Sequence, residues 1–307
     1  MERTKGKKLS SELKDAEPKT PEMTRRDFLK RLGYASGLAL AAGGLGLALH
    51  DRQGPTPSQL RKALTGLGDY ALKTPGPGKM AIVRGTDRKA MVEKGVKALG
   101  GIETFIQKGD RVLLKVNAAF ATPASLGATT HPEVLAAVAD LCLKAGAAQV
   151  LVTDNPINNP ASCYEISGLA AAARNSGARI IAPSANLFAP VSLPGGKLIR
   201  NWPTLAGVFQ GVAKVMVLSP VKDHHRAGAS MTLKNYYGFL GGRRNVFHQD
   251  INGIITELAL LLKPTLCVLD GTVTMMTNGP TGGSLSDLKE TGTLVVSTDP
   301  VAADAVG

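Results

Sequence analysis

Short apolar runs and helical stretches alternate along the chain from residue 79 onward. The runs at 111–116 and 149–153 are rich in Val and Leu, as is typical of strands buried on both faces. Apolar residues at helical spacing follow at 132–145 and end at a glycine, a common helix stop. The predicted strands are 80–83, 111–116, 149–153, 178–182, 215–218, 265–269 and 293–298, and the predicted helices are 87–101, 132–145, 162–176 and 250–262. This alternation predicts an α/β fold with a mostly parallel, Rossmann-like β-sheet and helices on both faces.

Two stretches break this rhythm. Residues 187–192 and 197–200 flank Pro194-Gly195-Gly196 and predict a hairpin. Residues 301–307 begin a helical pattern that is too short to bury an apolar face. We therefore expect the domain to lack its last C-terminal elements in this chain.

The first 78 residues follow a different pattern. Residues 1–23 are polar, charged and aperiodic, which is typical of disorder. Arg25 and Arg26 precede Phe28-Leu29-Lys30 and a Gly/Ala-rich apolar segment at 37–49, an order that resembles a twin-arginine export signal. The apolar segment is shorter than the roughly 20 residues of a membrane span. We predict a disordered region with a twin-arginine signal or anchor at 1–50, a Pro/Gly-rich linker at 51–78 and one α/β domain at 79–307. The expected location is periplasmic or membrane-anchored facing outward, reached through the twin-arginine translocation machinery.

Composition narrows the classes of function. The net charge of +12 includes no basic run interleaved with aromatic residues, so we predict no nucleic-acid surface. The three cysteines form no CxxC or ferredoxin-like run, so the chain supplies no iron–sulfur cluster ligand set. Cys142 and Cys267 lie in a helix pattern and a strand pattern, which predicts that both are buried.

Polar side chains follow the predicted strands where each strand ends. The densest set lies within residues 214–248, where an apolar strand breaks at Pro220 and three of the five histidines follow. Because the carboxyl ends of parallel strands share one edge of a sheet, we expect these groups to converge in one crevice. The predicted catalytic residues are His224, His248, Lys234 and Asp154, and the predicted ligand-binding residues are Lys115, Asn117, His131, Lys222, Asn235, Asp270, Asn278 and Asp299.

Two chemistries fit these residue types. His224, His225 and Asp270 are candidate ligands of a divalent metal, although no HxH or i,i+4 spacing fixes a coordination geometry. Alternatively, the lysines clamp a carboxylate or phosphate while one histidine acts as acid or base. The sequence contains neither a Ser-His-Asp elbow nor a catalytic Cys-His signature.

Several short motifs occur in an order that resembles a known family. They are Lys115-x-Asn117, Thr130-His131-Pro132-Glu133, Asp154, Lys222-x-His224, Leu233-Lys234-Asn235-x-x-Gly238, Asp270-Gly271, Asn278-Gly279-Pro280 and Asp299-Pro300-x-Ala302-x-Asp304. Over residues 80–307 the chain resembles the family labelled domain of unknown function 362. The resemblance implies an association with iron–sulfur centres, since members often carry ferredoxin-type modules, but this chain lacks those cysteines. Family sequences also run on beyond the last motif, in agreement with the expected loss of C-terminal elements.

The function stays open between three classes. The first is an exported enzyme whose crevice binds a small anionic ligand, a metal or both, and catalyses proton-transfer or redox-linked chemistry. The second is a non-catalytic binding or maturation protein for a periplasmic redox partner. A purely structural surface protein is the third, and it predicts that the polar groups scatter over the surface.

Overall fold

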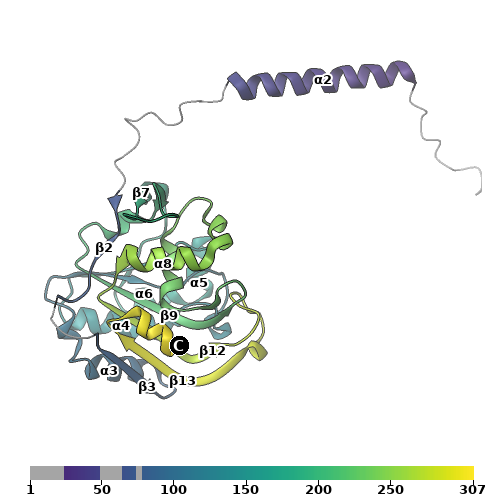
Figure 1. The fold of residues 1–307 in the computed structure, drawn as a ribbon. Helices are drawn as coiled ribbons and strands as arrows, with labels where there is room; N and C mark the ends of the chain where they lie inside the picture. The colour runs from purple at the N-terminus through teal and green to yellow at the C-terminus, as the bar shows by residue number, and fades with distance from the viewer. Residues whose placement is uncertain (1–23, 49–63, 74–77) are drawn as a thin grey trace, which may run out of the picture. The chain divides into compact units, whose positions relative to one another are not determined.

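A computed structural model describes residues 24–48, 64–73 and 78–307 (Figure 1). The chain divides into two units, residues 1–60 and 61–307. The first contains helix α2 (Arg25–Ala48), which begins at the predicted twin-arginine pair and is exposed over residues 25–45. Within the described ranges, no helix has both the length and the apolar character needed to cross a membrane. The predicted disordered segment 1–23 and most of the predicted linker lie outside the described residues.

An eight-stranded sheet forms the centre of the second unit. Its order is β3-β13-β12-β9-β4-β5-β6, with β10 paired to β9. The strands are β3 (Met80–Arg84), β4 (Arg111–Lys115), β5 (Gln149–Thr153), β6 (Arg179–Ile180), β9 (Lys214–His224), β10 (Gly228–Ser230), β12 (Leu266–Met275) and β13 (Leu288–Ser297). Strands β6, β5, β4, β9 and β12 run parallel. The predicted mixed α/β fold with a large, mostly parallel sheet is confirmed.

The order of the parallel strands changes direction between β4 and β9. From β4 the chain moves outward to β5 and then β6, and it returns to place β9 on the other side of β4, followed by β12. In open α/β sheets a crevice forms at the carboxyl ends of the strands where the strand order changes in this way. This position holds the site described below.

Helices cover both faces of the sheet (Figure 1). Because side chains alternate along a strand, Leu114 and Met216 face one apolar core while Leu113 and Val215 face the other. The first core packs against α3 (Arg88–Ala98), α4 (Pro132–Lys144) and α6 (Leu169–Asn175), and the second against α8 (Ile251–Leu261), α7 (Thr232–Asn235) and α9 (Pro300–Val306). Cys142 and Cys267 are buried as predicted, and both are free, as is Cys163.

Two small sheets extend the folded unit. Strands β1 (Leu64–Thr65), β7 (Ala189–Ser192) and β8 (Trp202–Thr204) form one sheet, and β2 (Gly68–Asp69) pairs with β11 (Leu262–Lys263). Residues 64–69, predicted as linker, thus belong to the folded unit. The predicted hairpin is wrong in its second arm, because β7 pairs with β8 and not with residues 197–200. The amides of residues 197–199 instead donate to the carboxylate of Glu257.

Two predicted elements are interrupted or extended. The helix at 162–176 is divided into α5 (Pro160–Ile166) and α6 by Gly168, which has φ 78°. Strand β9 does not end at Pro220 but continues to His224. Pro220 lies opposite Asp270, at the point where the regular pairing of β9 with β12 ends. Its missing N–H therefore removes no hydrogen bond from the paired residues 216–219.

The C-terminal strand runs in the opposite direction to the one expected. Strand β13 is antiparallel to β12 and to β3. Its carboxyl end therefore lies at the edge of the sheet opposite the ends of β4 and β9, and the group that follows it cannot join their crevice.

Candidate functional site

A cavity of ≈ 600 Å³ lies where β4, β5 and β9 end. Of the predicted site residues, it is lined by Asn117, Asp154, Lys222, His224, Lys234, Asn235 and His248. Lys115 does not line the cavity itself but contacts two of these residues, Asp154 and Asn235. Eight of the twelve predicted catalytic and ligand-binding residues thus line or contact one cavity, and they do not scatter over the surface as expected of a purely structural protein.

A buried ion pair forms the floor of the cavity. Lys115, at the end of β4, has a fully buried side chain, and its Nζ lies 2.8 Å from Asp154 Oδ1 after β5. The same ammonium donates to the carbonyl of Val116 at 2.7 Å and to Asn235 Oδ1 at 2.9 Å. Asp154 also accepts the backbone amide of Ala118 at 2.6 Å. All three N–H groups of the Lys115 ammonium have a partner in the protein. This lysine therefore holds the floor of the cavity in place and is not free to bind a ligand.

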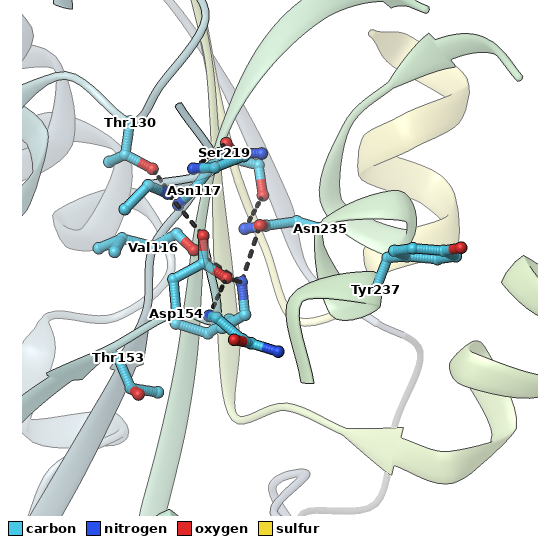
Figure 2. Close-up of polar contacts among 12 residues, drawn as sticks. Val116, Asn117, Thr130, Thr153, Asp154, Ser219, Asn235 and Tyr237 are labelled. Carbon is cyan, nitrogen blue, oxygen red and sulfur yellow. Dashed lines mark hydrogen bonds and ion pairs between the residues drawn. The ribbon is translucent and has the colours of Figure 1, made fainter. Parts of the chain in front are cut away.

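Asn235 links the floor to strand β9. Its amide nitrogen donates to the carbonyl of Leu218 at 3.2 Å and to Ser219 Oγ at 2.9 Å. In Figure 2, Asp154, Asn235 and Ser219 point toward one another, and dashed lines mark these bonds. The network therefore connects β4, β5, β9 and α7 through polar side chains that are all buried.

Gly238 allows the chain after α7 to approach this network closely. A Cβ atom at this position would overlap Asp154 Oδ1 and lie 2.7 Å from Lys115 Nζ. Only a residue without a side chain leaves room for the ion pair. Gly238 belongs to the Leu-Lys-Asn-x-x-Gly motif, but the spacing of that motif gives no sign of the contact, which depends on β4 and β5 more than 80 residues away.

Two further lysines line the cavity, and neither has a carboxylate partner among the residues that the structure describes. Lys222 is 2% exposed, and its ammonium group donates to the carbonyl of Ala128 and lies 5.2 Å from the centre of the Phe120 ring. Burial and the charge of Lys234 lower the pKa of Lys222 to about 7. Lys234 lies over the Tyr237 ring at 4.0 Å, and burial together with Arg244 lowers its pKa to about 8. In the described part of the chain, no side chain forms a hydrogen bond or ion pair with Lys234 Nζ.

Three histidine rings form a stack along one wall. The ring of His224 lies 5.3 Å from that of His225 and 5.9 Å from that of His248, with interplanar angles of 14° and 12°. Burial and the charge of Lys234 lower the pKa of His224 to about 4 and also lower the pKa of His248. His224 and His248 are therefore neutral near neutral pH, so their ring nitrogens can take part in proton exchange and do not carry a fixed charge.

The hydrogen bonds of the stack fix the protonated nitrogens. His224 Nδ1 accepts the backbone amides of Arg226 and Ala227, each at 3.3 Å, so the neutral ring carries its proton on Nε2. His248 Nδ1 lies 3.2 Å from the carbonyl oxygen of Asn245, which can only accept a hydrogen bond. His248 therefore carries its proton on Nδ1, and its Nε2 has a free lone pair. One wall thus offers a proton donor and a proton acceptor.

Arg244 shapes the opening of the cavity. Its guanidinium donates to the carbonyls of Asn155 at 2.7 Å, Leu240 at 3.2 Å and Tyr237 at 3.3 Å. These bonds use three of its five N–H donors and hold the guanidinium against the protein. Arg226 also lines the cavity and is the more exposed of the two arginines.

Four predicted site residues lie elsewhere, and each has a local partner. Asp270 accepts Arg88 Nε at 2.9 Å, and Arg88 also approaches Glu133 at 3.8 Å, beside His131. His131 caps α4 by accepting the amide of Glu133 at 3.3 Å. Asn278 donates a hydrogen bond to Asp287 at 2.6 Å, and Asp299 is the N-cap of α9. Asp299 is at the opposite sheet edge because β13 is antiparallel, which corrects the expected convergence.

The candidate metal ligands do not assemble. Asp270 is paired with Arg88 outside the cavity, while His224 and His225 stack face to face within it. Among the described residues, no group of three or more His, Cys, Asp or Glu side chains is arranged to hold a metal ion. The cavity instead contains a single carboxylate, Asp154, which is already paired with Lys115, and four lysine and arginine side chains: Lys222, Lys234, Arg226 and Arg244.

Comparison with known proteins gives a family and two relatives. The family described as domain of unknown function (DUF362) matches residues 112–307. A thylakoid-associated protein of Synechocystis sp. is 29% identical over 224 residues, which make up 69% of this chain and 66% of that protein. A crystal structure of a protein from Thermotoga maritima aligns with a TM-score of 0.31 and 12% identity, over 63% of this chain and 52% of the other. This chain therefore spans only part of the length of both proteins.

Proposed function

The chain belongs to the family of the domain of unknown function 362, and from the geometry of its cavity we propose that it binds a small anionic compound and exchanges protons with it. The observation that carries this proposal is the charge of the lining residues. Four lysine and arginine side chains, Lys222, Lys234, Arg226 and Arg244, line the cavity, while its one carboxylate is already paired with Lys115. An anion is the ligand that compensates such an excess of positive charge.

The histidine stack supports proton exchange with the bound compound. His224 presents a proton on Nε2 and His248 presents a lone pair on Nε2, as their backbone hydrogen bonds require. Both line the same cavity as the cations. A ligand held by its anionic group beside this wall has a hydrogen-bond donor and a base available to it.

Three finer points belong to this proposal. The strand order around β4 and β9 supports a Rossmann-like arrangement of the parallel strands. The paired Arg25 and Arg26 at the start of α2 support export by the twin-arginine route, and the name of the thylakoid-associated relative supports a location near a membrane. The described cysteines are buried singly in different elements. We therefore propose that any redox role depends on a partner protein that carries the iron–sulfur cluster.

Calorimetric titration with inorganic phosphate and with acetate tests the anion site. Wild-type protein is expected to bind at least one of them, and Lys234→Ala to bind it about 10- to 100-fold more weakly, as for loss of a charge-assisted hydrogen bond. Lys94→Ala, which removes an exposed lysine of α3, is the matched control and leaves the affinity unchanged. Equal affinity in wild type and Lys234→Ala would contradict the proposal.

Deuterated buffer separates an enzyme from a binding protein. Pyruvate is a small anion whose methyl protons exchange when a base removes them. Deuterium incorporation that is faster with wild type than with His248→Gln supports proton transfer. Binding of pyruvate without incorporation supports the non-catalytic alternative, a binding or maturation protein.

A further inference from the structure

On the basis of the proposed anion site, we propose that Lys234 is an amine nucleophile that condenses with the carbonyl group of a small anionic aldehyde or ketone. The substrate class thus narrows from any small anion to carbonyl compounds that carry a carboxylate or phosphate. A buried lysine among other cations is an arrangement that activates an amine for such chemistry.

The structure holds the amine of Lys234 in the cavity without neutralising it. The residue belongs to the one-turn helix α7, whose first amides are bound by the carboxylate of Asp304 at 2.8 and 2.9 Å. Its Nζ lies 4.0 Å from the centre of the Tyr237 ring, and it lines the cavity. Among the described residues its amine has an aromatic neighbour and no carboxylate partner, so no ion pair holds it as an ammonium.

Burial and neighbouring charge favour the neutral amine. The pKa of Lys234 falls from the ordinary 10.5 to about 8, first through burial and then through the positive charges of Arg244 and Lys115. A neutral amine has the lone pair that attacks a carbonyl carbon, whereas an ammonium does not. Near neutral pH a usable fraction of Lys234 is therefore nucleophilic.

The other two buried lysines are less suited to attack. Lys115 donates to Val116, Asp154 and Asn235, so its nitrogen is committed to the floor. Lys222 donates to the carbonyl of Ala128 and is enclosed beside Phe120. With Arg226, Lys222 remains to hold the anionic group while Lys234 meets the carbonyl.

The condensation moves two protons from nitrogen to oxygen, and the histidine wall relays them. The lone pair of Lys234 Nζ forms a bond to the carbonyl carbon, and the carbonyl π electrons move to oxygen, which accepts a hydrogen bond from His224 Nε2. His248 Nε2 accepts one proton from the nitrogen and passes it to the oxygen, which gives a carbinolamine. The remaining proton of the nitrogen is transferred to the oxygen through His248 in the same way, as the carbon–oxygen bond breaks and the carbon–nitrogen double bond forms. One amine and one carbonyl give one imine and one water, and no oxidant or reductant takes part.

Reductive trapping with cyanoborohydride tests this step. The full-length protein is incubated with pyruvate and the reductant, and the adduct is measured by intact mass and located by peptide mapping. One reduced pyruvate is expected per chain, on Lys234. Its rate of formation is expected to rise with pH and level off above about 8, and not to keep rising toward the 10.5 of an ordinary lysine.

Two variants and a second anion complete the test. Lys234→Arg keeps a cation but has no nucleophilic amine, so it should lose the adduct while still binding propionate, which has the charge of pyruvate and no carbonyl. Lys94→Arg, on the exposed face of α3, should trap pyruvate as wild type does.

Each remaining outcome decides between the two proposals. Binding of propionate by wild type without any trapping of pyruvate would overturn the nucleophile and leave the anion site standing. Binding of neither compound by wild type would overturn both. An adduct that maps to Lys222, or that persists in Lys234→Arg, would overturn the assignment to Lys234.

Discussion

Gly238 shows how one position can control the buried polar network. A methyl group there would overlap Asp154 Oδ1 and crowd Lys115 Nζ, and both groups lack space to move because they are buried. We predict that Gly238→Ala lowers the free energy of unfolding by about 3 kcal/mol, through overpacking and separation of a buried ion pair. Urea unfolding measures this change.

The control for Gly238 is a glycine in open space. Gly37 in α2 has no atom within 4 Å of an added Cβ. Gly37→Ala is therefore expected to leave the unfolding of the second unit unchanged. A Gly238→Ala protein as stable as wild type would mean that the pair separates without cost.

Lys222 links stability to pH. Its folded-state pKa is about 7, below the 10.5 of the unfolded chain, so between these values the folded state binds fewer protons than the unfolded state. Stability attributable to this residue therefore rises with pH from about 7 to 10.5, and below about 7 the cost of burying the charge is constant. We predict that Lys222→Met removes up to about 1.4 kcal/mol per pH unit from this rise.

The pH effect is measured by urea unfolding at several values between pH 7 and 9.5. Lys94→Met replaces an exposed lysine and should keep the wild-type slope. Met should also be tolerated or stabilising at pH 7, because it fills the space of the lysine stem without burying a charge. An identical slope in wild type and Lys222→Met would show that the buried amine does not titrate in this window.

At the scale of elements, α7 depends on a distant residue for its start. It has four residues, and the amides of Thr232 and Leu233 are bound by Asp304 near the end of the chain. We predict that Asp304→Ala lowers the free energy of unfolding by about 1 kcal/mol, as loss of a helix cap does, and also weakens anion binding because Lys234 loses its support. Denaturation and the phosphate or acetate titration measure the two effects.

Asp87 provides the matched control for Asp304. It caps α3 by accepting the amide of Ala90 at 3.0 Å, and it is not among the residues that line the cavity. Asp87→Ala should therefore cost similar stability and leave anion affinity unchanged. Weakened binding in both variants would indicate a general loss of structure and not a role for α7.

The elements differ in how well their sequences predict them. The helix at 132–145 and the strands at 111–116 and 149–153 carry strong periodicity and are found within a residue or two of the prediction. The predicted end of β9 is wrong. A proline usually ends a strand, but Pro220 lies where the pairing with β12 shifts register, and the strand continues past it. That exception depends on a partner strand about 50 residues away and leaves no local signal.

At the scale of the whole molecule, the site is predictable where it follows from parallel strands. Lys115, Asp154 and Lys222 meet because β4, β5 and β9 share a direction. The predicted place of Asp299 is wrong because strand direction is not encoded in the apolar run 293–298. The predicted place of Asp270 is wrong because its partner Arg88 comes from a helix whose packing cannot be read from spacing. The correct and the wrong predictions thus differ in the long-range pairing of strands and side chains, more than in local propensity.

The central place of β9 also has a consequence for synthesis on the ribosome. Strand β4 pairs with β5 on one side and β9 on the other, yet β9 begins only at Lys214, long after Lys115 has been made. At typical translation speeds the interval is about 5–20 s. During that time β4 presents an unpaired hydrogen-bonding edge, the kind of surface on which nascent chains associate. Protection of this edge by chaperones, or slow translation just after β9, is therefore expected to govern the yield of folded protein.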